Sequence, residues 1–246
     1  VDDATGTQQI DMYDIMFEDN VLTGSGSGGG ASLFAMDVWI NLVGFVNNTA
    51  TDIGGGLYLR EQTRNRTINS GFVNNTARAG GGYGTDPYNG SGIVLEHTTF
   101  TDNVATDFGG GAYIARGLPN PQIYFYNNII WGNTGPLGAD IYIDDDPNDV
   151  GGDQVTQVEL VNNIYTDFTT KCRANVECND RVIETDNINA NPLIDDGLHL
   201  LMGSPAIDAG LNTGHPSYPV VNVDFDGDAR PFDGDGDGVA TRDIGI

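Results

Sequence analysis

GFVNNTA occupies residues 44–50 and recurs without change at residues 71–77. A third copy, TFTDNVA, occupies residues 99–105, and in all three cases a Gly-Gly-Gly triplet follows two or three residues later. With looser copies on either side, the apolar anchors of this phrase fall at residues 17, 45, 72, 100 and 130, which gives steps of 27 to 30 residues. A fixed period of this length is typical of a solenoid, in which each repeat stacks on the next.

The segments between the copies have the composition of short β-strands. Residues 57–60, 92–96 and 122–126 are rich in β-branched and aromatic side chains and are bounded by Gly, Asn or Pro. None shows a sustained helical period. Short strands with a turn every eight to ten residues fit a three-sided coil whose equivalent strands pair about 4.8 Å apart. We therefore predict an all-β fold, a right-handed parallel β-helix (solenoid).

The repeat also predicts two columns of like side chains. An apolar column is expected inside the coils, and an asparagine column at a turn, where asparagine tolerates the left-handed conformation and its amide bonds to the coils above and below. The glycine triplets are expected to supply positive φ angles, although a flexible linker is the alternative for residues 24–30. The columns are Phe17, Phe45, Phe72, Phe100 and Ile130, and Asn20, Asn48, Asn75, Asn103 and Asn133.

The charge of the chain excludes several classes of partner. Its 246 residues include 10 Lys and Arg against 35 Asp and Glu, for a formal net charge of −25. Such a chain repels phosphate backbones and anionic lipid surfaces, so we expect no nucleic-acid partner. We also expect no direct membrane insertion, because no apolar run approaches the ~20 residues of a membrane span. The first residues lack the basic and apolar regions of an uncleaved export signal.

The two cysteines, Cys172 and Cys178, lie close together in the sequence. Their surroundings contain no second pair of zinc ligands. We predict that they form a small disulfide loop in an exported protein, with a pair of free thiols as the alternative.

The C-terminal region carries the clearest chemical motif. Asp233, Asp235 and Asp237, with Gly238, reproduce the first half of an EF-hand-type loop, in which carboxylates spaced by two residues curl around Ca²⁺. The match is incomplete, because Ile244 stands where the usual glutamate would be. An acidic loop neutralised by arginines and water is the alternative. A structural Ca²⁺ would pin the last turn over the end of the β-helix. The predicted ligands are Asp224, Asp226, Asp228, Asp233, Asp235, Asp237 and Asp243.

The pattern Phe-x-x-Asn-x-Ala followed by Gly-Gly-Gly-x-Tyr resembles the repeats of polymorphic outer-membrane-protein-type β-helix surface proteins. The tail, with NPLID at residues 191–195 and GSPAIDAG at residues 203–210, is similar to the C-terminal part of bacterial choice-of-anchor β-helix proteins. Together the two matches span roughly residues 15–246. The resemblance implies an exported β-helix and no particular activity, although some members are described by analogy with pectate lyases.

The sequence shows no convincing catalytic constellation. Lyase chemistry would need a basic residue beside Ca²⁺ and a basic groove, whereas the few basic residues here are scattered. Hydrolase chemistry would need carboxylates that converge on one face. Asp52, Asp102 and Asp107 could align on one side of the β-helix, although Asp52 and Asp107 precede glycine triplets, where a turn role is sufficient. The densest other group is interpreted as solvated turn residues: Asp144, Asp145, Asp146, Asp149 and Asp153. The histidines His97, His199 and His215 lie far apart and lack a partner motif.

Four tyrosines, Tyr58, Tyr83, Tyr113 and Tyr142, follow the glycine motifs in successive coils. We expect a stacked column that is buried or half-buried. An outward column would instead form a strip for stacking on sugars or binding protein.

These observations predict one extracellular or cell-surface domain. Residues 1–210 are expected to form the β-helix, and residues 211–246 an Asp/Gly-rich calcium-binding cap that packs on it. The predicted role is a module for adhesion, matrix formation or surface assembly, with a carbohydrate, a surface protein or a second copy as partner. The alternatives are a polysaccharide lyase or hydrolase and a carbohydrate-binding module, each with its site on a lateral sheet.

Overall fold

The computed structural model describes residues 9–34, 37–60, 64–86, 92–115, 122–144, 157–170 and 181–246. Strands and turns make up these ranges, and they contain no helix. It follows that the described residues include no helix long and apolar enough to cross a membrane.

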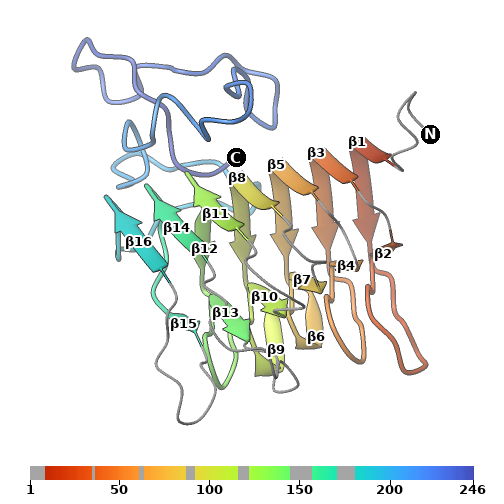
Figure 1. Cartoon of the computed structure of the whole chain (residues 1–246). Coiled ribbons are helices and arrows are strands. Elements are labelled where there is room, and N and C mark those ends of the chain that lie inside the picture. The colour runs from red at the N-terminus through yellow and green to blue at the C-terminus, as the bar shows by residue number, and fades with distance from the viewer. Residues whose placement is uncertain are drawn as a thin grey trace.

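The strands form three parallel sheets (Figure 1). The first sheet has the order β1-β3-β5-β8-β11-β14-β16, with β12 also paired to β8, and the second has the order β15-β13-β10-β7-β4-β2. The third sheet pairs β6 with β9. Because each strand pairs in parallel with its equivalent in the next coil, the chain is a parallel β-helix, as predicted.

The first sheet contains β1 (Gln9–Glu18), β3 (Asp37–Val46), β5 (Arg64–Val73), β8 (Gly92–Thr101), β11 (Gln122–Tyr126), β12 (Ile129–Trp131), β14 (Gln157–Val161) and β16 (Arg181–Thr185). The second contains β2 (Ala31–Phe34), β4 (Leu57–Arg60), β7 (Tyr83–Asp86), β10 (Ala112–Ala115), β13 (Ile141–Asp144) and β15 (Phe168–Thr170), and the third contains β6 (Thr76–Ala79) and β9 (Val104–Phe108).

The coils turn at three corners, each marked by a column of residues with positive φ. The first corner lies in the middle of the long strands β1, β3, β5 and β8 and directly after the short strands β11, β14 and β16. The second corner follows the ends of β1, β3, β5, β8 and β12, and the third lies at the glycine triplets. Left-handed backbone at the same place in every coil keeps the corners aligned. The columns are Asp14, Leu42, Asn69, His97, Asn127, Asn162 and Asp186; Asp19, Asn47, Asn74, Asp102 and Gly132; and Gly28, Gly54, Gly80, Gly109 and Gly138.

The apolar column is confirmed. The rings of Phe45 and Phe72 stack 4.8 Å apart, those of Phe72 and Phe100 stack 4.6 Å apart, and Phe17 stacks on Phe45 at 5.1 Å. Ile130 is in register with Phe100. Strands on opposite sides of the coil therefore close around one continuous core.

The asparagine column is also confirmed. Asn48 Nδ2 donates to Asn75 Oδ1 at 3.0 Å and to the carbonyl of Phe17, one coil earlier, at 2.9 Å. The same two bonds recur for Asn75 and Asn103. Each buried amide thus satisfies polar groups of the coils on both sides, which removes the cost of burying it.

A second amide column follows the first corner and was not predicted. Asn128 Nδ2 donates to Asn163 Oδ1 at 2.9 Å, and Asn163 Nδ2 donates to Asn187 Oδ1 at 3.1 Å. In earlier coils Ser70 and Thr98 hold this position, and each donates its hydroxyl to a backbone carbonyl. The signal for this column was the repeated Asn-Asn-Ile at residues 127–129 and 162–164.

The tyrosines do not form one column, so that prediction is wrong in part. Tyr83 pairs with Leu57 and is fully buried, whereas Gly84 takes the position between Tyr58 and Tyr113. Tyr83 directly follows its glycine triplet, while one residue separates the glycine motif from tyrosine at Tyr58 and Tyr113. A shift of one residue reverses the face in a strand. Only Tyr113 and Tyr142 stack, at 6.1 Å, and both are buried, which excludes an exposed sugar-binding strip of these four residues.

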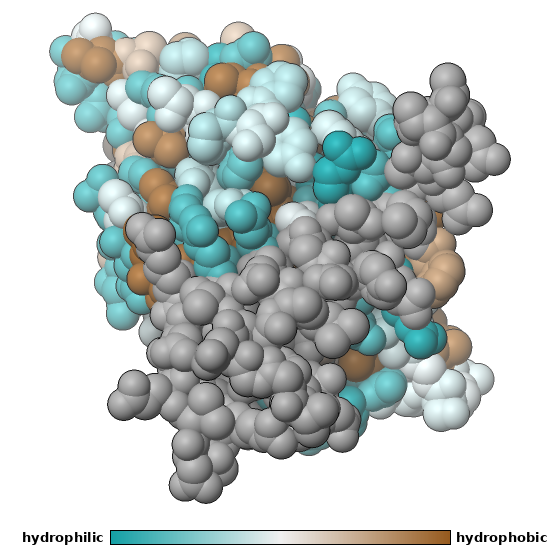
Figure 2. Space-filling model, in the orientation of Figure 1, coloured by the Kyte–Doolittle hydropathy of each residue, from teal (hydrophilic) through white to brown (hydrophobic). Residues whose placement is uncertain are grey.

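The C-terminal tail packs along the side of the β-helix, at the first corner. Asn69, Asn127 and Asn162 donate their side-chain amides to the carbonyls of Val223, Leu211 and Ala209 at 2.8–3.1 Å. In Figure 1 the blue tail accordingly lies beside the strands of the first sheet. This differs from the expected position over the last coil. On the described part of the face shown in Figure 2, polar residues predominate and apolar residues are scattered among them.

Candidate functional site

The structure places six of the seven predicted calcium ligands in two groups. Carboxylate oxygens of Asp233 and Asp235 lie within 4.8 Å of one another and of a third residue, Asp208. Four of the others line a neighbouring cavity of about 460 Å³. These four are Asp224, Asp226, Asp228 and Asp243.

The loop at residues 233–239 curls as the spacing predicts. Asp233 accepts hydrogen bonds from the backbone amides of Gly236 and Gly238 at 2.7 and 3.0 Å. Asp235 accepts from the amide of Asp237 at 2.9 Å. The Asp237 carboxylate accepts from the amide of Val239 at 2.7 Å and belongs to neither group.

Sequence reasoning missed Asp208. Its carboxylate accepts from the amides of Asp235 at 2.9 Å and Thr241 at 3.2 Å, and its own amide donates to Asp243 Oδ1 at 2.8 Å. It lies in GSPAIDAG, which we interpreted as a marker of architecture alone. Asp208 and Asp233 are half-buried and Asp235 is exposed, and the three offer carboxylate oxygens, which a hard cation prefers, from two segments of the chain.

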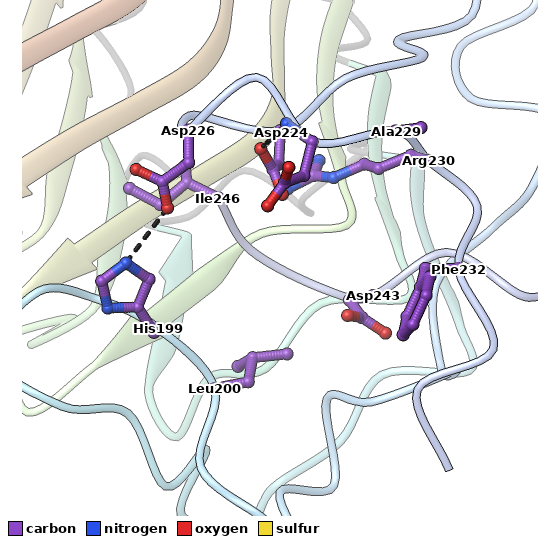
Figure 3. A pocket seen from close by; sticks show the side chains of 10 residues that line it. His199, Leu200, Asp224, Asp226, Ala229, Arg230, Phe232, Asp243 and Ile246 are labelled. Atoms are coloured by element: carbon purple, nitrogen blue, oxygen red, sulfur yellow. Dashed lines mark hydrogen bonds and ion pairs between the residues drawn. The ribbon is translucent and has the colours of Figure 1, made fainter. Parts of the chain in front are cut away.

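The cavity beside this group is lined by four aspartates and by two basic residues, His199 and Arg230 (Figure 3). His199 bridges two carboxylates, with Nδ1 3.2 Å from Asp195 and Nε2 3.0 Å from Asp226. Its hydrogen bond to Asp195, followed by the contact with Asp226, raises the pKa of His199. Arg230 donates to the carbonyl of Gly245 at 2.9 Å, and burial lowers the pKa of Arg230 to about 10.

Two further features complete the rim of this cavity. Burial raises the pKa of Asp243, whose side chain lies beside Phe232 in Figure 3. Phe232 is 70% exposed. The cavity therefore presents several carboxylates and an aromatic ring to solvent, which suits a cationic group.

An apolar groove of about 230 Å³ adjoins the cavity, and Ile246 lines both. The floor of the groove includes Gly44 and Gly71 on the outer face of the first sheet, and the tail contributes Leu198 and Phe225. It lies between the early coils and the tail.

A buried ion pair between β5 and β8 contacts the tail. Arg66 donates to Glu96 Oε2 at 3.1 Å and to the carbonyl of Pro219 at 2.8 Å, and its guanidinium lies over the ring of Tyr218. The side chains of Arg66 and Glu96 are only 7% and 1% exposed. Burial raises the pKa of Glu96, while Arg66 opposes that shift. Loss of one partner would leave the other charge buried and unpaired.

Most candidate catalytic residues have structural partners. Asp52 and Asp107 both pair with Arg78, at 2.8 and 3.3 Å, which ties successive coils together. Asp102 accepts from the hydroxyl of Thr101. Asp144 accepts from the hydroxyl of Tyr113 at 3.2 Å. The predictions for Asp145, Asp146, Asp149 and Asp153, and for the Cys172–Cys178 disulfide, concern residues outside the described ranges.

His97 and His215 are buried. His97 Nδ1 donates to the carbonyl of Gly245 at 3.2 Å, and Nε2 accepts from Asn127 Nδ2 at 3.1 Å, so the ring is neutral. Burial, reinforced by Arg230 and Arg242, holds the pKa of His97 well below its usual range.

Acid should therefore weaken the protein through His97. Below the ordinary histidine pKa of about 6.5, the unfolded chain binds a proton that the folded chain refuses, so stability falls as pH falls, by up to about 1.4 kcal/mol per pH unit. Urea unfolding of the wild type and of His97→Gln at pH 7.0 and 5.5 measures this loss. We expect a smaller loss in the variant, since Gln does not titrate.

His199→Gln is the matched control, because the pKa of His199 is raised rather than lowered. It should leave the acid-induced loss at least as large as in the wild type. Equal losses in the wild type and His97→Gln would contradict this account of His97.

Searches with the sequence and the structure find no matching family model, curated protein or solved structure. The resemblance to polymorphic outer-membrane-protein-type and choice-of-anchor proteins therefore stays a prediction. The structure shows the parallel β-helix that this resemblance implies.

Proposed function

We propose that the chain is an exported module of a cell surface or extracellular matrix, a right-handed β-helix that serves adhesion or assembly. The observation that carries the proposal is the register of the coils, which repeat the same corners and the same buried columns along the first sheet. A stack of this kind is stiff and offers long lateral faces without depending on a single reactive residue.

The partners of the charged side chains support this role. The repeated ion pairs of Arg78 with Asp52 and Asp107 run from coil to coil, and the buried pair of Arg66 with Glu96 fixes the tail. These ion pairs therefore join neighbouring coils to one another and the tail to the β-helix.

The proposal is tested by adding the purified chain to immobilised polysaccharides and matrix proteins. Retained protein and newly released reducing ends are measured together, with sedimentation velocity to detect self-association. We expect retention or self-association without release of sugar. Release above that of the heat-denatured protein would overturn the proposal in favour of a polysaccharide-active enzyme, and an inert monomer on every surface would overturn it as well.

We propose that Ca²⁺ binds at Asp208, Asp233 and Asp235 and stabilises the tail. Three carboxylates from two segments fit a hard cation, whose charge would offset their mutual repulsion. At a hundredfold excess over its dissociation constant, a bound ion adds about 2.7 kcal/mol, or about 5–10 °C in melting temperature for a chain of this size.

Thermal melts in Ca²⁺ and in chelator should show this difference for the wild type. Asp208→Asn should remove most of it, whereas Asp237→Asn, the matched control, should keep it because Asp237 lies outside the group. A wild-type midpoint that is the same in chelator and in Ca²⁺ would rule out the site.

A further inference from the structure

The tail covers the outer face of the first sheet in the later coils, and in the early coils the apolar groove lies between that face and the tail. Met16, Gly44, Gly71 and Thr99 are in register, and Ile129 continues the same column. Ile129 is fully buried against tail residues that include Ala206 and Ile244. Met16, at the other end of the column, is 55% exposed.

The apolar groove lies at the early end of this column. Because Gly44 and Gly71 lack side chains, Met16 lies over Gly44 and the tail lies close over Gly71, with Val46 and Val73 beside the two glycines. A Cβ at Gly71 would lie 3.1 Å from Leu198 and 3.6 Å from Ile246. The groove thus continues the interface that the tail makes with the later coils.

The charge around the groove indicates what it accepts. Asp196 lines the groove itself, and beyond Ile246 the adjoining cavity carries the carboxylates of Asp224, Asp226, Asp228 and Asp243. A second copy of a chain with net charge −25 is a poor partner for this surface, whereas a cationic segment is attracted to it.

We propose that the groove and cavity together bind an extended segment of a partner protein in which an aliphatic side chain stands next to a lysine or arginine. The aliphatic side chain occupies the apolar groove, and the cationic group enters the acidic cavity beside Phe232. Apolar anchoring with charge complementarity gives both affinity and specificity. This inference rests on the proposed adhesion or assembly role and names the class of partner.

Isothermal titration with the peptide acetyl-Ala-Leu-Lys-Ala-Leu-Lys-Ala-amide tests the proposal. We expect saturable binding that is lost when glutamate replaces both lysines or serine replaces both leucines. Gly71→Val should weaken binding at least tenfold by filling the groove, and the atoms nearest its Cβ are the flexible side-chain ends of Leu198 and Ile246, so the fold should persist. The double variant Asp226→Asn/Asp228→Asn should weaken it at least tenfold through charge.

Two matched controls separate the site from general effects. Gly92→Ala adds a methyl group where no atom lies within 4 Å, and Asp107→Asn removes a charge beside Arg78 on the third sheet. Both should bind the peptide as the wild type does.

Three results would overturn the inference. They are no saturable binding by the wild type at millimolar peptide, equal binding of the glutamate peptide, and a wild-type dimer that Gly71→Val abolishes, which would make a second copy the occupant. Retention on a surface that Gly71→Val leaves unchanged would overturn this inference alone and leave the adhesion role standing.

Discussion

Phe72→Ala is expected to destabilise the protein by about 3–5 kcal/mol. The Phe72 ring is fully buried and lies between those of Phe45 and Phe100, at 4.8 and 4.6 Å. Its edge also meets the ring of Tyr83 from across the coil. Truncation removes stacking on both sides and opens a cavity in the middle of the column. Because each coil is stabilised chiefly by its neighbours, the loss weakens the cooperation of the early coils with the later ones.

Equilibrium unfolding in urea, followed by intrinsic fluorescence and by circular dichroism, measures this effect. Phe34→Ala is the matched control, since Phe34 is a strand residue that is 63% exposed, and it should change stability by no more than about 0.5 kcal/mol. The two probes should diverge in Phe72→Ala if the stack separates into two units. Equal stability of Phe72→Ala and the wild type would show that the aromatic column does not hold the coils together.

The core of the β-helix could be predicted because each coil repeats the same local chemistry. Phe45, Phe72 and Phe100 recur in one context, so a single interpretation of the period placed all of them. The same holds for Asn48, Asn75 and Asn103, whose amides have one role in successive coils. A repeat supplies several independent observations of one environment, which is why the register was read correctly.

The path of the tail could not be predicted in the same way. Among the bonds that hold the tail at the first corner are those from the side-chain amides of Asn69 and Asn127 to tail carbonyls. Every residue carries a carbonyl, so the acceptor side of these bonds leaves no mark in the sequence. The meeting of Asp208 with Asp233 was equally hard to predict. Antiparallel backbone bridges such as that of Gly210 with Arg242 bring their segments together, and backbone pairing leaves no mark in the sequence.

The first and second glycines of each triplet are required for different physical reasons. Positive φ was expected for the triplets, and the structure shows it at the first glycine, such as Gly54 at +69°. The second glycine is required for a different reason, which is its approach to the backbone of the next coil. A Cβ on Gly55 would lie 2.6 Å from the Thr76 carbonyl oxygen and closer still to that of Gly81.

Gly55→Ala is therefore expected to destabilise the protein by about 3 kcal/mol or more, at or above the upper end of the range for overpacking. The obstructing atoms belong to the backbone and cannot move aside as a side-chain tip could. The coils would have to separate locally, which would break the bonds from Gly55 and Gly56 to the carbonyls of Gly80 and Gly81 at 3.0 and 3.2 Å. Urea unfolding and amide hydrogen exchange of the third corner would report the loss.

Gly92→Ala provides the comparison that isolates close approach from glycine content. Both changes add one methyl group and reduce the freedom of the unfolded chain equally, but Gly92 has no atom within 4 Å of an added Cβ. Gly92→Ala should thus be neutral or stabilising by up to about 1 kcal/mol. If Gly55→Ala were equally benign, the second glycine of the triplet would not set the spacing of the coils, and the third corner would be held by its hydrogen bonds alone.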